Sequence, residues 1–411
     1  MSKSVRLIAL MCAAEVLAMM GISSFAALLP GLAAEWSLSN TDAGWIGGIY
    51  FAGYVLMVPV LTSLTDRIDA RLIFLTGTAI GAVGALGFAL FADGFWTAAF
   101  WRMLTGIGLA GTYMPGLKAL NDRLAGRARS RAVAFYTASF GIGMSLSYLL
   151  AGEIVRFADW RAVFLAAAGA SAAAFVLAAV VLGRHEAEAP GRPGTHLLDF
   201  RPVFRNREAM GYVLGYTAHV WELFGLRAWI VAFLVFSASV QANPDVWLPP
   251  TVVATIFMLV GTPSSIFGNE LAMRFGRRRV IAVVMVSCAL FGTALGFSGG
   301  LDYSLVVAMA LVYAALLMGD SASLTAGMVE AAEPAYRGAT MAVHSTIGFL
   351  GAAAAPPVFG LVLDLTGGRA DASAWGFAFI SLGAVTLLGP LTLTMGAKAA
   401  QARMAGTGRS T

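Results

Sequence analysis

Residues 73–92 read IFLTGTAIGAVGALGFALFA, a run of 20 residues without one charged side chain. An α-helix of about 20 apolar residues spans the hydrocarbon core of a bilayer and satisfies its backbone hydrogen bonds internally. The run is too long and too continuous for a strand of a membrane barrel, whose residues alternate between apolar and polar. This stretch therefore predicts a membrane-spanning helix.

Eleven further stretches have the same character. Nine are also free of charge, and two more hydrophobic stretches, 94–118 and 209–236, are interrupted by charged residues. The nine uncharged stretches are 16–34, 43–65, 132–152, 162–183, 246–269, 280–301, 303–319, 338–363 and 372–397. The sequence thus predicts an all-α membrane protein with 12 transmembrane helices.

The composition of the 411-residue chain supports this fold class. Hydrophobic residues make up 59% and charged residues 12%, against about 45–50% and about 25% in soluble globular proteins. So few charges exclude an ordinary cytosolic enzyme, a disordered chain and a coiled coil. The two cysteines, Cys12 and Cys288, lie in apolar stretches, which excludes a disulfide framework.

The distribution of basic residues predicts the orientation. If the N-terminus is cytoplasmic, the cytoplasmic segments hold 21 Lys and Arg and the opposite loops hold three. Such an excess marks the cytoplasmic side, so both termini are expected there. The net charge of +5 then reflects topology, and a nucleic-acid partner is not expected. The N-terminal apolar run is interrupted by Glu15 and followed by eleven more spans, which favours a first membrane helix over a signal peptide.

The two halves of the chain repeat. Arg129-Ser-Arg-Ala-Val-Ala-Phe-Tyr136 matches Arg337-Gly-Ala-Thr-Met-Ala-Val-His344, at a separation of about 208 residues. The predicted organisation is a six-helix bundle at 1–183, a Pro- and Gly-containing cytoplasmic linker at 184–208, a second six-helix bundle at 209–398 and a tail at 399–411. Parallel repeats of this kind are typical of transporters.

Two loops and one helix carry a family pattern. The loop after the second span holds Asp66, Arg67, Asp69 and Arg71, and its repeat holds Arg274, Gly276, Arg277 and Arg278. The fourth span contains Arg102-x-x-x-Gly106-x-Gly108. With twelve spans and the repeat, the chain resembles the major facilitator superfamily over essentially its whole length.

The resemblance implies alternating access, with the substrate bound between the halves near mid-membrane. It implies that Asp66, Arg67, Arg71, Arg274, Gly276, Arg277 and Arg278 act in gating, through contacts that break when the halves rock. The alternative for any single arginine there is topology alone. The glycine-proline kink of family antiporters would fall at Ser147-Tyr148, and its absence weakens a drug-antiporter interpretation.

Ionisable residues inside membrane helices are costly and mark functional sites unless they are paired. The candidates for substrate binding or proton coupling are Glu15, Arg102, His219, Glu222, Arg227, Asp320 and His344. Each has a structural alternative, such as a fixed ion pair for Glu15 and Arg102 or polar packing for His344. Lys118, at the cytoplasmic end of its span, is expected to extend to the interface.

The seventh span carries the densest group. His219 and Glu222 share a helical face and suit a proton relay. Arg227 lies about 140° further around the helix, so its counter-charge is expected from another helix or from an anionic substrate. Asp320 is predicted either to pair with Arg227 or to carry a proton. Tyr113 and Trp221 are expected to line the substrate site.

These patterns predict a proton-coupled secondary transporter of a small organic solute, with a carboxylate or another anion as one option for the substrate. Nothing indicates an enzyme, a metal site or a cofactor; the expected energy source is a proton gradient. The expected setting is the bacterial inner membrane, and the expected state is a monomer. Two alternatives remain open: a drug or metabolite:proton antiporter working in efflux, and a non-transporting membrane protein for assembly or sensing.

Overall fold

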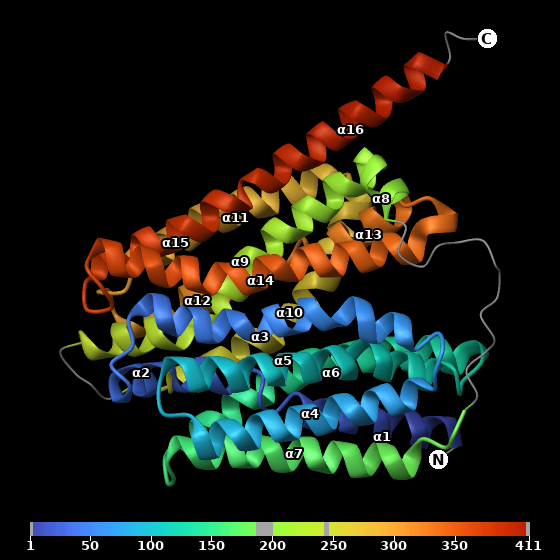
Figure 1. Ribbon diagram of the computed structural model, residues 1–411. Coiled ribbons are helices and arrows are strands. Elements are labelled where there is room, and N and C mark those ends of the chain that lie inside the picture. The colour runs from blue at the N-terminus through green and yellow to red at the C-terminus, as the bar shows by residue number, and fades with distance from the viewer. Residues whose placement is uncertain (1–2, 186–199, 242–245, 408–411) are drawn as a thin grey trace. The chain divides into compact units, whose positions relative to one another are not determined.

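The structure, a computed structural model, describes residues 3–185, 200–241 and 246–407. These ranges contain sixteen α-helices and one 3-10 turn and no strand (Figure 1), which confirms the predicted all-α fold class. The helices before the linker are α1 (Lys3–Ala18), α2 (Ser24–Glu35), α3 (Asn40–Leu64), α4 (Ala70–Phe91), α5 (Phe95–Asn121), α6 (Gly126–Ile154) and α7 (Trp160–Val181).

The helices after the linker show the same long, apolar character. They are α8 (Arg201–Arg205), α9 (Arg207–Ser239), α10 (Pro250–Phe275), α11 (Arg277–Phe297), α12 (Tyr303–Met318), α13 (Ser321–Ala331), η1 (Pro334–Tyr336), α14 (Arg337–Thr366), α15 (Ala372–Thr386) and α16 (Leu388–Thr407). Most of the predicted linker and the end of the predicted tail, 186–199 and 408–411, lie outside the described residues.

Ten helical stretches within the described ranges are long and apolar enough to cross a membrane, by length and composition. They coincide with ten of the twelve predicted spans. The predicted span 16–34 falls on α1 and α2, which are separated by a turn at Met19–Ser23, and the predicted span 94–118 falls on α5. For these two segments, membrane crossing stays a prediction.

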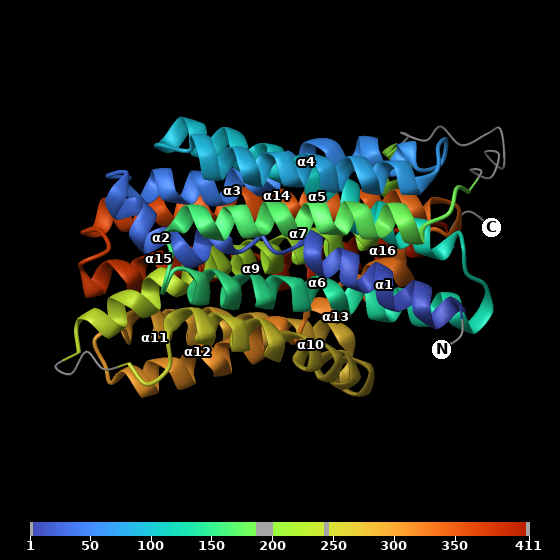
Figure 2. The ribbon, with the colours of Figure 1, turned by 90° about the horizontal axis from the view of Figure 1, so that it is seen from below.

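The chain forms two compact units. The first comprises Met1–Pro193, Arg227–Val235 and Asp245–Leu259, and the second comprises the remaining segments, Gly194–Leu226, Phe236–Pro244 and Val260–Thr411. In the first unit α3, α4, α5 and α7 run side by side (Figures 1 and 2).

Short polar caps start several of the helices. Ser39 and Asp42 form a reciprocal capping box at α3, with the Asp42 amide donating to Ser39 Oγ over 3.0 Å. The carboxylates of Asp159, Asp302 and Asp371 accept hydrogen bonds from the first amides of α7, α12 and α15. These caps satisfy amides that have no partner inside the helix, so each loop can turn the chain within a few residues.

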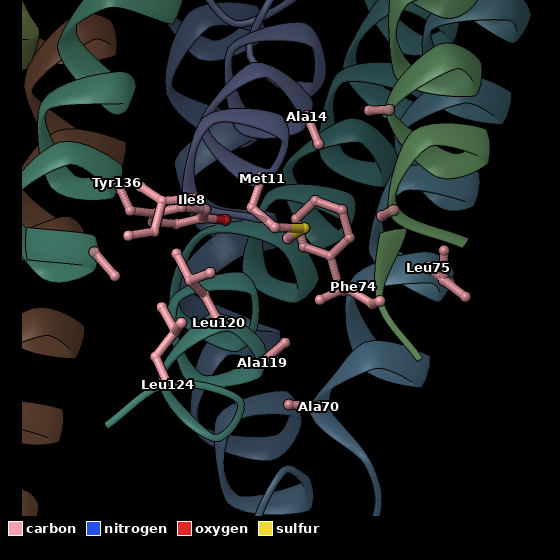
Figure 3. Close-up of a cluster of buried hydrophobic side chains, with 14 residues drawn as sticks. Ile8, Met11, Ala14, Ala70, Phe74, Leu75, Ala119, Leu120, Leu124 and Tyr136 are labelled. Atoms are coloured by element: carbon pink, nitrogen blue, oxygen red, sulfur yellow. The ribbon is translucent and has the colours of Figure 1, made fainter. Parts of the chain in front are cut away.

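Each unit has a buried apolar cluster, and the two clusters use repeat-related helices. In the first unit Ile8, Met11, Phe74, Leu120 and Tyr136 gather from α1, α4, α5 and α6 (Figure 3), with further members on α7. The second cluster draws on α8, α9, α11, α13, α14 and α16. The two sequence repeats therefore also place their buried apolar clusters on corresponding helices.

Glycines set the closest helix contacts of the first unit. A methyl group at Gly108 of α5 would lie 2.7 Å from the amide nitrogen of Gly81 and 2.8 Å from the carbonyl oxygen of Gly77, both on α4. Gly106 faces α3 so closely that a methyl group there would overlap the carbonyl oxygen of Tyr50. The Gly106-x-Gly108-x-x-Gly111 pattern thus serves helix packing, although its spacing resembles a dinucleotide-binding motif.

Candidate functional site

Glu15 lies on α1 and is completely buried in the first unit. Its Oε2 accepts a hydrogen bond of 2.7 Å from the hydroxyl of Tyr136 on α6. The same hydroxyl lies 3.1 Å from the carbonyl oxygen of Thr112 on α5. Among the residues that the structure describes, no lysine or arginine lies within ion-pair distance of this carboxyl. Glu15 is thus held by a neutral hydroxyl group.

Glu222 has the same kind of environment in the second unit. It lies on α9 and is 1% exposed. Tyr313 of α12 donates to Oε1 over 2.5 Å, and Thr386 of α15 donates to Oε2 over 2.9 Å. Glu15 and Glu222 are 207 residues apart, so the internal repeat places a buried carboxyl with hydroxyl partners at equivalent positions of both halves.

Asp320 is paired with His219 in the second unit. Asp320 Oδ1 lies 2.8 Å from His219 Nδ1, and both side chains are buried. Asp320 sits at the break between α12 and α13, where it precedes α13 without capping it; instead, Ser265 Oγ accepts the Ala322 amide over 3.2 Å. The pair predicted for Asp320 was with Arg227, whereas the contact found is with His219; the proton-carrying role stays a prediction.

His344 lies on α14 and packs against Tyr216 of α9. The two rings are stacked with centroids 3.9 Å apart, and His344 Nε2 lies 3.5 Å from Thr325 Oγ1. The Tyr216 ring also stacks on His219, at 5.9 Å. His219, Asp320 and His344 therefore belong to one buried polar cluster in the second unit.

Arg102 of α5 contacts the backbone of the first helix pair. It is 3% exposed, and its two terminal nitrogens donate to the carbonyl oxygens of Gly21 and Ile22 over 3.1 and 3.2 Å. The Tyr50 ring lies under the guanidinium at 4.3 Å. Arg102 thus contacts two carbonyl groups and an aromatic face, and no ion pair of its guanidinium with a described residue is found.

The remaining predicted site residues are Arg227, Tyr113 and Trp221. Arg227 belongs to the first unit, where its backbone carbonyl accepts from the Tyr148 hydroxyl and its Nη1 lies 3.6 Å from Met144 Sδ. Tyr113 stacks on Tyr136 with ring centroids 6.4 Å apart, beside Glu15. Trp221 on α9 is half-buried.

The loop after α3 forms an ion pair, but with a residue other than those predicted. Asp66 and Arg67 are exposed and form no ion pair with any residue described. Asp69 caps α4 and pairs with Arg123 at 3.1 Å, and the His185 amide donates to it over 2.9 Å. Arg71 donates to the carbonyl of Ala179 on α7 over 3.0 Å. This corner ties the ends of α4, α5 and α7 together.

The repeat-related loop of the second unit has its own ion pairs. Arg277 Nη2 lies 2.8 Å from Glu330 Oε1 at the end of α13, and Arg278 pairs with Glu208 at the start of α9. Gly276 precedes α11 at φ +93°, a conformation that favours glycine. Arg274 packs on the neighbouring Phe275 ring at 5.2 Å.

Replacing Asp69 with asparagine should lower stability in a pH-dependent way. Partial burial alone would raise the pKa of Asp69, but hydrogen bonds from the Arg71 and His185 amides and from Arg123, together with the Arg123 charge, lower that pKa below its usual range. A carboxyl with a lowered folded-state pKa stabilises the fold above its unfolded-state pKa and loses that effect as pH falls through the folded-state pKa.

The expected loss for Asp69→Asn is therefore about 2 kcal/mol of unfolding free energy at neutral pH, shrinking toward zero in strong acid. Urea unfolding in detergent at several pH values measures it. Asp122→Asn is the matched control, because Asp122 pairs with Lys118 near the surface, where a pair contributes about 0.2–1 kcal/mol. Equal losses for the two variants, or a loss independent of pH, would contradict the assignment.

Four partners of the buried or capping carboxyls were not predicted from the sequence: Tyr136, Tyr313, Thr386 and Arg123. Tyr136 was detectable in principle, because the repeat aligns it with His344. Among the described residues, no cluster of three or more His, Cys, Asp or Glu is arranged to hold a metal ion.

Comparison with known proteins shows which family the chain resembles. The family model described as Major Facilitator Superfamily matches residues 11–252 and 250–403. Protein spinster homolog 1 from Homo sapiens is 25% identical over 292 residues, which cover 67% of this chain and 55% of that protein. The match thus spans about half the length of that relative. Monocarboxylate transporter 4 from Rattus norvegicus is 23% identical over 388 residues, covering 88% of this chain and 76% of that protein.

Solved structures share the fold. A bacterial homolog to the human lysosomal transporter Spinster, in an inward-facing and occupied conformation, superposes with a TM-score of 0.70 at 16% identity, covering 96% of this chain and 95% of that one. The nucleoside transporter NupG superposes with a TM-score of 0.75 at 14% identity, covering 97% and 100%.

Proposed function

The chain belongs to the major facilitator superfamily, and we propose that it is a secondary active transporter that moves a small organic solute together with protons. The observation that carries proton coupling is the pair of buried carboxyls, Glu15 and Glu222, at equivalent positions of the two halves. A buried ionisable group without a charged partner is costly in a membrane protein and marks a functional site.

The hydroxyl partners suit groups that change protonation state. A tyrosine or threonine hydroxyl donates to an ionised carboxylate and accepts from a protonated carboxyl. The contacts of Glu15 with Tyr136 and of Glu222 with Tyr313 and Thr386 can therefore persist in both states. An arginine partner, which has no acceptor, would fix the ionised state.

The proposed solute is a small carboxylate or a related anion. Arg227 lies in the interior of the membrane-spanning helix α9, and guanidinium binds carboxylates through two parallel hydrogen bonds. The similarity to monocarboxylate transporter 4 supports the same class. The proposed setting is a bacterial inner membrane, and the proposed state is a monomer. Both termini are proposed to be cytoplasmic, because 21 of the basic residues lie in segments assigned to that side.

Export by the same fold is the second candidate function. It is less favoured because Ser147 and Tyr148 occupy the position of the antiporter kink and are engaged in hydrogen bonds there. Susceptibility of a pump-deleted host separates the two: raised resistance to toxic solutes on expression supports export, and raised uptake of a labelled solute supports import.

Purified protein in liposomes that enclose a pH-sensitive dye tests the proposal. A panel of monocarboxylates, dicarboxylates, nucleosides and sugars is added outside. We expect a carboxylate to produce an internal pH change that protein-free liposomes lack. If a non-carboxylate produces it, the proposed solute class is wrong; if radiolabelled solute enters without any pH change, proton coupling is wrong. If expression changes a host phenotype but no solute moves, the non-transporting alternative replaces the proposal.

A further inference from the structure

The first membrane segment is broken where its repeat-related segment is continuous. Residues Met19–Ser23 form a turn between α1 and α2, whereas α9 runs without interruption from Arg207 to Ser239. With the repeat separation of 207, Met19–Ser23 corresponds to residues 226–230, in the middle of α9. The break is therefore a special feature of the first half.

Two side chains from other helices bind the backbone of this break. Ser147 of α6 donates from Oγ to the carbonyl of Met20 over 2.7 Å and accepts the Ser23 amide over 3.0 Å. Arg102 of α5 donates to the next two carbonyls, of Gly21 and Ile22. Together they satisfy four backbone groups that a helix break leaves without helical partners.

The repeat supplies an internal comparison. The positions that correspond to Arg102 and Ser147 are Met309 and Ala355, counting separations of 207 and 208, and neither side chain can donate a strong hydrogen bond to a carbonyl. The local sequences differ as well: Gly21 and Ser23 are poor helix formers, and the corresponding residues are Ala228 and Ile230. The break thus occurs in the half that has the two donors.

The break lies next to the proposed proton site. The Met19 amide donates to the Glu15 carbonyl over 3.0 Å, so Glu15 stands in the last turn of α1 before the chain leaves the helix. The helix that carries Ser147, α6, also carries Tyr136, the hydrogen-bond partner of Glu15. Side chains of α6 therefore form hydrogen bonds both with the backbone of the break and with the Glu15 carboxyl.

We propose that Arg102 and Ser147 are positioning residues: they hold the break at Met19–Ser23 and thereby hold the Glu15 carboxyl against Tyr136. This inference rests on the proposed function, in which Glu15 carries a proton. Arg102 acts here through the backbone and not as the counter-charge of the acid. Its charge is compensated by the carbonyl oxygens of Gly21 and Ile22 in the break and by the Tyr50 ring.

Carbodiimide labelling of the full-length protein tests this without a known solute. A hydrophobic carbodiimide reacts with protonated buried carboxyls, and mass spectrometry reports labelling of Glu15 and Glu222 separately in one sample. The pH at which half of Glu15 is labelled is compared between wild type, Arg102→Gln, Arg102→Lys and Ser147→Ala. Glu222 lies in the other unit and serves as the internal control.

We expect the Glu15 midpoint to move by about one pH unit in Arg102→Gln and Ser147→Ala, with less change in Arg102→Lys and an unchanged Glu222 midpoint. Thr386→Val is the converse control and should move the Glu222 midpoint alone.

Unchanged Glu15 midpoints in both variants, or parallel shifts of Glu15 and Glu222, would overturn the positioning role. If wild-type Glu15 shows no pH-dependent labelling, the proton role itself is wrong. If Arg102→Gln does not fold, Ser147→Ala and Arg102→Lys decide the question.

Discussion

Replacing Glu222 with glutamine is expected to abolish proton-driven accumulation of the solute, lowering the accumulation ratio about 100-fold, while solute exchange across the membrane continues. Glutamine keeps the shape of glutamate, and its oxygen still accepts a hydrogen bond from Tyr313 or Thr386. It carries no titratable proton, so the cycle loses its link to the proton gradient. Uptake and exchange of radiolabelled solute in the same liposomes measure the two quantities.

Glu153→Gln is the matched control for this variant. Glu153 lies at the end of α6, is 41% exposed and pairs with Arg156, so its neutralisation should leave both accumulation and exchange unchanged. Glu15→Gln should resemble Glu222→Gln, since the two carboxyls are repeat-related. Wild-type accumulation by Glu222→Gln would remove this residue from the coupling mechanism.

Replacing Gly106 with valine is expected to prevent the first unit from folding stably. The first side-chain carbon would overlap the carbonyl oxygen of Tyr50, and a backbone group cannot move aside as a side chain can. Overpacking of a tight core costs about 1–3 kcal/mol and sometimes more; the direct overlap with the backbone places Gly106→Val at the upper end. The yield of monodisperse protein and its thermal unfolding in detergent report the loss.

Gly169→Ala is the control for the glycine prediction. Gly169 lies within α7, and no atom lies within 4 Å of the position where a methyl group would be added. Alanine is the better helix former by about 1 kcal/mol, so this variant should unfold at the same temperature or higher. A Gly106→Val protein as stable as wild type would show that α3 and α5 are not packed as described.

The helices could be predicted well from the sequence because so few of its residues are charged. In the stretch 73–92, hydropathy alone marks a helix, and α4 covers it from Ala70 to Phe91. The repeat could also be found, because loops such as 129–136 and 337–344 keep similar residues at one separation. These features depend on local composition, which the sequence displays directly.

Partners between helices could not be predicted in the same way. Periodicity places His219 and Glu222 on one face of α9, yet His219 pairs with Asp320 and Glu222 with Tyr313 and Thr386. The choice depends on which helices adjoin α9. In the sequence, a tyrosine such as Tyr313 within an apolar helix is typical of a packing residue. Its hydrogen bond to Glu222 becomes visible only in the structure.

The break between α1 and α2 was also not predicted. The run 16–34 contains Gly21 and Ser23, but glycine and serine are common in unbroken membrane helices, and α9 and α4 both contain glycine. What distinguishes the break is Arg102, more than 80 residues later in the sequence. Arg102 was expected either to take part in substrate binding or proton coupling or to form a fixed ion pair, whereas its contacts are with backbone carbonyls.

The most direct test of proton coupling applies a pH difference across the membrane and measures whether it moves the solute. Liposomes containing the protein and equal solute on both sides receive a step in external pH, with the membrane potential clamped by potassium and valinomycin. Coupling predicts that labelled solute moves against its own gradient until a protonophore collapses the pH difference. Solute that stays at equal concentrations throughout, in liposomes where exchange is demonstrably active, would contradict the account.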